Sequence, residues 1–174
     1  MISEKMQEFL NQQIQKEFYS AYLYLSMEAY LEEQNLKGFA QFFRVQIQEE
    51  RDHAMMFFKY ISHVQGNVKL LQIDQPKTVF TSPLDVFKAA YNHELIVTKS
   101  IYSIVDLSLE EKDHKTNAFL QWFVNEQAEE EANMDDNIKK LQLIGGDSRG
   151  ILMMDAELMT RIYTPSINPA LGAV

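Results

Sequence analysis

The pentapeptide "EERDH", Glu49–His53, decides how this sequence is read. It lies in a long stretch whose apolar residues recur every three to four positions, the spacing of one face of an α-helix. On that apolar face the pentapeptide places a carboxylate, Glu50, and an imidazole, His53. Because an uncompensated buried charge is strongly unfavourable, a charge on this face calls for a compensating group in the core.

Long helices account for most of the chain. Glycine and proline are scarce, with 6 and 4 among 174 residues, so few positions break a helical pattern. Ser3 and Ser82 are placed as N-caps, and the pair Gly145-Gly146 ends a helix. The predicted helices span residues 4–33, 36–65, 83–111, 113–144 and 149–163, and a tail covers 164–174.

The segment between the second and third helices is long enough to cross the bundle from end to end. About 17 extended residues reach roughly 55 Å, whereas a helix of about 28 residues is about 42 Å long. The third helix can therefore start at the same end as the second. The sequence predicts a single all-α domain over residues 1–174, an up-down-down-up four-helix bundle with a long crossover and a short fifth C-terminal helix.

Polar residues interrupt the apolar stripe of each of the four long helices near its middle. Helix midpoints meet in a bundle whichever way the helices run, so these residues are expected to converge. They are Glu17, Glu50, His53, Glu94, Gln127 and Glu130.

Four carboxylates gathered in a core require a counter-charge, because burial and mutual repulsion raise their pKa values. No lysine or arginine lies on the stripes. Two divalent cations would balance the carboxylates, with His53 and Gln127 filling remaining positions. Oxygen-rich ligation with one imidazole and no thiolate suits iron or manganese better than structural zinc or copper(I).

Several neighbouring residues have two interpretations from the pattern alone. Glu126 and Glu129 flank the stripe at the depth of Glu49, which fits either a secondary cation site or a solvated face. Tyr24 and Trp122 lie within about a turn of the same level, where core packing explains them more simply than chemistry does. Two histidines outside the stripes are expected at the surface, His63 and His93.

The amino-acid composition limits which binding partners and which cellular location are expected for this protein. A net charge of -9 and a pI of about 4.9 argue against general nucleic-acid binding and favour affinity for cations. The absence of cysteine excludes disulfides, thiolate metal sites and cysteine nucleophiles, and it favours an intracellular location. No apolar run approaches the roughly 20 residues of a membrane span, and the start lacks a secretory signal pattern. A cytoplasmic protein is expected.

The residues quoted so far resemble those of a bacterial non-haem ferritin, and the resemblance covers nearly the whole chain. Ferritin-like di-iron proteins build their centre from glutamates and Glu-x-x-His on facing helices. The marks are "QKEFYSAYLY" with Glu17, "EERDH" with Glu50 and His53, "AYNHE" with Glu94, and "FLQWFVNEQAEEE" with Gln127 and Glu130.

The resemblance implies specific ligands and an assembly. It implies a first iron bound by Glu17, Glu50 and His53, and a second bound by Glu50, Glu94 and Glu130 with Gln127 beside them. It further implies an extra iron site at Glu49, Glu126, Glu129 and Glu130, and aromatic neighbours of the centre at Tyr24 and Trp122. Two to three irons per subunit, a homo-oligomeric 24-subunit cage, oxidation of Fe(II) by O2 or H2O2, and storage of an Fe(III) mineral are the implied properties.

The sequence differs from that of bacterioferritins at two places, and two other functions are also considered. Arg51 stands where bacterioferritins have a haem-binding methionine, and Gln127-x-x-Glu130 replaces their second Glu-x-x-His, so no haem is expected. One alternative is a ferritin-like di-iron oxygenase or peroxidase acting on an organic substrate, although such enzymes commonly keep both Glu-x-x-His motifs. The other is a metal buffer without mineral storage.

Overall fold

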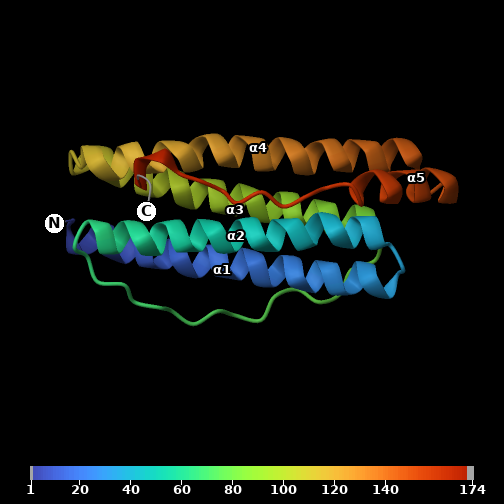
Figure 1. Ribbon diagram of the computed structural model, residues 1–174, viewed down its shortest axis with the longest axis horizontal. Coiled ribbons are helices and arrows are strands. Elements are labelled where there is room, and N and C mark those ends of the chain that lie inside the picture. Colours follow the sequence, from blue (N-terminus) through green and yellow to red (C-terminus); the bar gives the residue numbers. More distant parts are fainter. Residues whose placement is uncertain (1, 172–174) are drawn as a thin grey trace.

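The computed structural model describes residues 2–171 as a four-helix bundle with a short fifth helix and a 3-10 turn, and the described residues contain no strand (Figure 1). The helices are α1 Glu4–Glu33, α2 Lys37–His63, α3 Pro83–Glu110, α4 His114–Ile144, α5 Ser148–Leu158 and the turn η1 Pro169–Leu171. The crossover after α2 runs the length of the bundle, so α2 and α3 point the same way (Figure 1). The predicted up-down-down-up bundle is confirmed.

Side-chain caps fix the starts of three long helices. The hydroxyl of Ser3 accepts a hydrogen bond from the amide of Met6, and that of Ser82 accepts one from Asp85. Asp113 caps α4 in the same way. Each cap satisfies an amide that has no partner inside its helix. Gly145 ends α4 in the left-handed conformation, with φ of 59°, as its position in the sequence predicted.

Helix α2 is capped by another helix rather than by its own residues. Leu36 offers no side-chain cap, and Asp155 of α5 instead accepts hydrogen bonds from the amides of Gly38 and Phe39, at 2.8 and 3.0 Å. A Cβ atom on Gly38 would lie 1.6 Å from the carbonyl oxygen of Asp155. Glycine at position 38 is therefore what lets α5 pack against the start of α2.

The fifth helix is shorter than predicted. The sequence indicates a helix over 149–163, but α5 ends at Leu158, and the chain from Met159 continues without helix to residue 168. The cause is tertiary, because the carbonyl oxygen of Arg161 accepts a hydrogen bond from Gln41 of α2 and its side chain also bonds α2. Of the predicted tail 164–174, the last three residues lie outside the described part of the chain.

The apolar core consists of two clusters at opposite ends of the bundle. One gathers around Tyr24, Phe43 and Phe87, and the other around Phe57 and Phe119. The polar residues that interrupt the four apolar stripes lie between these two clusters along the bundle. None of the helices in residues 2–171 is long and apolar enough to cross a lipid bilayer.

Candidate metal centre

All six polar residues from the helix midpoints are buried, each at most 4% exposed. One comes from α1, two from α2, one from α3 and two from α4, so every long helix contributes. Their burial in one bundle core agrees with the convergence that the sequence predicted. They are Glu17, Glu50, His53, Glu94, Gln127 and Glu130.

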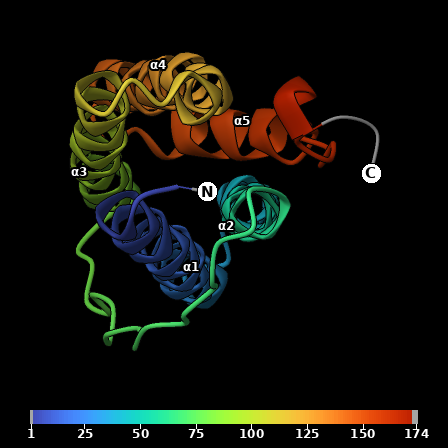
Figure 2. The ribbon, with the colours of Figure 1, turned by 90° about the vertical axis from the view of Figure 1, so that its left-hand side faces the viewer.

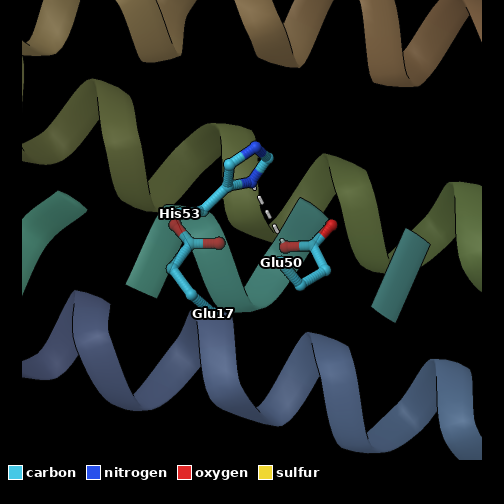
Figure 3. Close-up of side chains that lie close together, drawn as sticks. All are labelled: Glu17, Glu50 and His53. Carbon is cyan, nitrogen blue, oxygen red and sulfur yellow. Dashed lines mark ion pairs between the residues drawn. The ribbon is translucent and has the colours of Figure 1, made fainter. Parts of the chain in front are cut away.

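Three of these side chains form a tight cluster. Glu17, Glu50 and His53 each offer one potential ligand atom, and these atoms lie within 4.8 Å of one another. Figure 3 shows Glu17 reaching up from α1 towards the two side chains of α2, with Nδ1 of His53 at 3.5 Å from Oε2 of Glu50. Glu50 and His53 are one helical turn apart, which places both on the same face of α2. These are the three residues predicted to bind the first iron.

The carboxylates on the other side of the centre are held by neutral donors. The Tyr24 hydroxyl donates to Oε1 of Glu94, and Gln127 donates to Oε2 of the same carboxylate at 3.0 Å. Gln46 donates to Oε2 of Glu130 at 2.8 Å. Neither Glu94 nor Glu130 belongs to the cluster within 4.8 Å. The second predicted ligand set is thus more widely spaced than the first.

Among residues 2–171, no ion pair joins any of the four carboxylates of the centre to lysine or arginine, and the basic group that contacts Glu50 is the imidazole of His53. Burial is the main cause of raised pKa values throughout. It raises the pKa of Glu94 to about 7 and, with repulsion from Glu94, that of Glu130 to about 8. Burial followed by repulsion from Glu94, Glu17 and Glu130 raises the pKa of Glu50 well above its usual range. The pKa of Glu17 is raised by burial despite the nearby His53.

Two buried polar atoms lack a hydrogen-bond partner, Oε1 of Gln46 beside Glu130 and Nε2 of His53 on the side of the ring that faces Glu126. Buried polar groups are almost always satisfied, so unpartnered atoms beside four unneutralised carboxylates call for an additional group. A hard or borderline divalent cation fits this donor set, because it replaces the protons and ligates oxygen and imidazole nitrogen.

A second group of acids lies outside this centre and is called here the outer acid site, Glu49, Glu126 and Glu129. Glu49 and Glu126 are partly buried and Glu129 is exposed. Oε1 of Glu126 lies 3.8 Å from Nε2 of His53, so the imidazole stands between the centre and the outer acid site. Burial is the main cause that raises the pKa of Glu126, with His53 opposing and Glu129 and Glu49 adding to it.

Aromatic side chains border the centre as the resemblance implied. Tyr24 is fully buried, and its hydroxyl contacts a predicted ligand rather than only packing. Trp122 packs edge-on against the ring of His53, with centroids 5.4 Å apart. Trp122 therefore supports the imidazole from the side of α4.

His93 is buried, although the sequence predicted it at the surface. His93 was expected at the surface, yet it is 9% exposed and its Nε2 lies 2.8 Å from the Ser20 hydroxyl on α1. Position 93 falls beside the main stripe of α3 on a flank that α1 covers, which the helical period of α3 alone does not reveal. Burial lowers the pKa of His93 to about 4. His63 is exposed, as predicted.

Two glutamines that orient the ligands were not predicted as part of the site. Gln13 is fully buried and donates to Oε1 of Glu17 at 2.7 Å, and its own oxygen accepts from Ser100 at 2.6 Å. Gln46 lies on the stripe of α2 one turn before Glu50 and was available as a candidate. Gln13 lies one turn before Glu17, so the same spacing could have found it.

The chain matches known proteins over most of its length. A sequence model described as "Ferritin-like domain" matches residues 7–144. The bacterial non-heme ferritin of Campylobacter jejuni is 41% identical over 155 residues, which cover 89% of this chain and 93% of that protein. The bacterial non-heme ferritin of a Staphylococcus aureus strain is 36% identical over 163 residues, which cover 94% and 98%.

Solved structures of ferritins are also similar to this chain. The open pore ferritin from the hyperthermophilic archaeon Archaeoglobus fulgidus is 50% identical, with a TM-score of 0.92 over 93% of this chain and 100% of that one. An engineered closed form of the A. fulgidus ferritin gives 0.93 at 49% identity, over 94% and 100% of the two chains. The family match covers well over half of the chain, and the helices it covers carry the buried carboxylates. This chain belongs to the ferritin family.

Proposed function

We propose that this protein stores iron, and that it oxidises Fe(II) at the buried centre before storing Fe(III) as a mineral inside a cage. The observation that carries the proposal is the layer of four buried carboxylates and one imidazole without a lysine or arginine partner. The names of the relatives, bacterial non-heme ferritins, support the same function.

The centre would take two ferrous ions as substrate. Glu17, Glu50 and His53 would bind the first, and Glu94 and Glu130 would bind the second with Glu50 shared between them. Each Fe(II) gives up one electron, and O2 takes up the two electrons and two protons to become H2O2; with H2O2 as oxidant, two electrons and two protons yield two molecules of water. A pair of irons is needed because each oxidant accepts two electrons at one place.

The protein's own groups set the charge and the orientation of this centre. Cation binding would displace protons from Glu94 and Glu130, whose pKa values are raised to about 7 and 8. Tyr24 and Gln127 hold Glu94, and Gln46 holds Glu130, so these carboxylates start from fixed positions. Ligands positioned by such hydrogen bonds bind metal more tightly than freely rotating ones.

The wider properties are proposed on the family alone. We propose a homo-oligomer of 24 subunits that encloses the mineral in the cytoplasm, with the outer acid site and Glu130 taking a third iron and with no haem. An organic-substrate oxygenase or a passive metal buffer would share the fold but would not accumulate iron.

Two measurements on the same preparation test the proposal. Apoprotein mixed with Fe(II) in air should produce Fe(III) much faster than buffer does, measured by absorbance in the near ultraviolet. Size-exclusion chromatography with light scattering should then show a particle near 24 subunits carrying far more than three irons per chain. Oxidation no faster than buffer would refute ferroxidation, and a small oligomer holding two or three irons per chain would refute storage.

A further inference from the structure

The chain after α5 returns along the bundle on the side of α2 and α4. Figures 1 and 2 show this segment, residues 159–171 and called here the tail strap, lying on the side between these two helices. Four contacts fix it there. Gln41 donates to the carbonyl of Arg161 at 3.0 Å, Tyr163 donates to Asp52 at 2.6 Å, the amide of Ser166 donates to Asp52 at 3.1 Å, and Asn168 donates to the carbonyl of Phe119 at 3.0 Å.

The tail strap places the positively charged side chain of Arg161 against the outer acid site. Nη2 of Arg161 lies 2.7 Å from Oε2 of Glu49, and the two side chains are only 23% and 17% exposed. The guanidinium also stacks over the ring of Phe42 at 4.3 Å and lies 3.4 Å from the carbonyl oxygen of that residue. A charge held by a carboxylate, a carbonyl and an aromatic face is bound more firmly than an arginine in a surface ion pair.

The outer acid site has a further feature that points to a ligand. Nε2 of His53 is fully buried, has no hydrogen-bond partner and lies 3.8 Å from Oε1 of Glu126. The imidazole thus directs an unpartnered nitrogen towards these acids, while its Nδ1 lies at the buried centre. Of the three outer carboxylates, Glu49 is the one that the strap already neutralises.

We propose that Arg161, held by the tail strap, is a built-in counter-cation at Glu49 that weakens the binding of a third divalent cation by the outer acid site. This inference rests on the proposed function, because it assumes that the centre and the outer acid site bind iron. A cation that ligates Glu49 must either displace the guanidinium or lie beside a like charge, and both lower its affinity. Arg161 would therefore determine how strongly the third iron is held next to the first two.

Cation binding to the apoprotein measures this effect directly. Anaerobic calorimetric titration with Fe(II) gives the number of ions per chain and the dissociation constant of each class. Arg161→Gln should leave two tight ions unchanged and tighten the third by roughly two- to fivefold, the size expected for one partly exposed charge pair. Arg161→Lys keeps the positive charge and should bind the third ion as the wild type does.

A matched control removes an arginine charge on α2 that is not paired with an outer carboxylate. Arg51 is exposed and bonds only to Gln48, so Arg51→Gln should leave the third ion unchanged. The inference is overturned if Arg161→Gln binds the third ion with the dissociation constant of the wild type. It is also overturned if Arg51→Gln or Arg161→Lys binds the third ion as tightly as Arg161→Gln does. A wild-type chain without two tight ions overturns the proposed function instead, so the two failures are distinguishable.

Discussion

Replacing Glu130 by glutamine should stabilise the metal-free protein. The pKa of Glu130 is about 8 in the bundle, against an ordinary value of 4.5. At pH 7 the unfolded chain gains stability by releasing the proton, which the folded chain still holds. The gap from 4.5 to 7 is 2.5 units at about 1.36 kcal/mol each, so this carboxyl destabilises the apo fold by roughly 3 kcal/mol.

The pH dependence has a definite sign. The folded pKa is raised, so the penalty is absent below pH 4.5, grows as the pH rises above 4.5, and levels off above about pH 8. Glutamine carries no titrating group, and its amide oxygen can still accept the hydrogen bond from Gln46 that Glu130 accepts now. Glu130→Gln should therefore be more stable than the wild type at pH 7 by up to about 3 kcal/mol and nearly equal to it at pH 4.5.

Chemical denaturation of the two apoproteins at pH 4.5, 6 and 7.5, at one protein concentration, measures this difference. Glu129→Gln is the control, because Glu129 is exposed one residue away on α4 and should show no such gain. The gain should reverse once a divalent cation is added, since the variant lacks a ligand. A Glu130→Gln protein that is no more stable at pH 7.5, or equally stabilised at pH 4.5, would refute the reasoning.

Four further changes test the centre and the strap. Glu50→Ala should abolish the fast phase of iron oxidation, because it removes the carboxylate proposed to be shared by both irons; an unchanged rate in stopped-flow absorbance would contradict the shared role. Tyr24→Phe removes the donor to Glu94 and should weaken binding of the second cation about tenfold, measured by calorimetry. Binding of Zn(II) at pH 7 should release more protons per chain than at pH 9, because Glu94 and Glu130 hold protons only near and below pH 7 to 8; calorimetry in buffers of different ionisation enthalpy counts them. Tyr163→Phe should lower the free energy of unfolding by about 1 kcal/mol through loss of its hydrogen bond to α2, and an unchanged denaturation midpoint would show that the strap does not depend on it.

The fold and the burial of the polar residues at the helix midpoints were predictable because both follow from local periodicity. Long helices with few breaks fix the bundle, and helix midpoints meet without any knowledge of the packing angles. Glu17, Glu50, Glu94 and Glu130 are far apart in the sequence, yet each marks the same depth on its own stripe. Their common burial therefore needed no long-range information.

The remaining features depend on contacts that no local pattern records. Arg161 and Glu49 are 112 positions apart, and the strap has no helical or strand period that would show which surface it covers. The burial of His93 follows from how α1 lies against α3, which the stripe of α3 does not specify. The early end of α5 has the same origin, because the contacts of Arg161 hold the chain after Leu158 against α2.

The position of the charged layer between two apolar clusters connects stability with chemistry. Phe43 and Phe87 close the core on one side, and Phe57 and Phe123 close it on the other. These clusters exclude water from the carboxylates, which raises their pKa values and makes the metal-free fold less stable. The same exclusion leaves the carboxylates without competing solvent, so a divalent cation gains more by binding there than at the exposed surface. The outer acid site is less buried than the centre and already has Arg161, so iron should occupy the buried centre first and the outer site last.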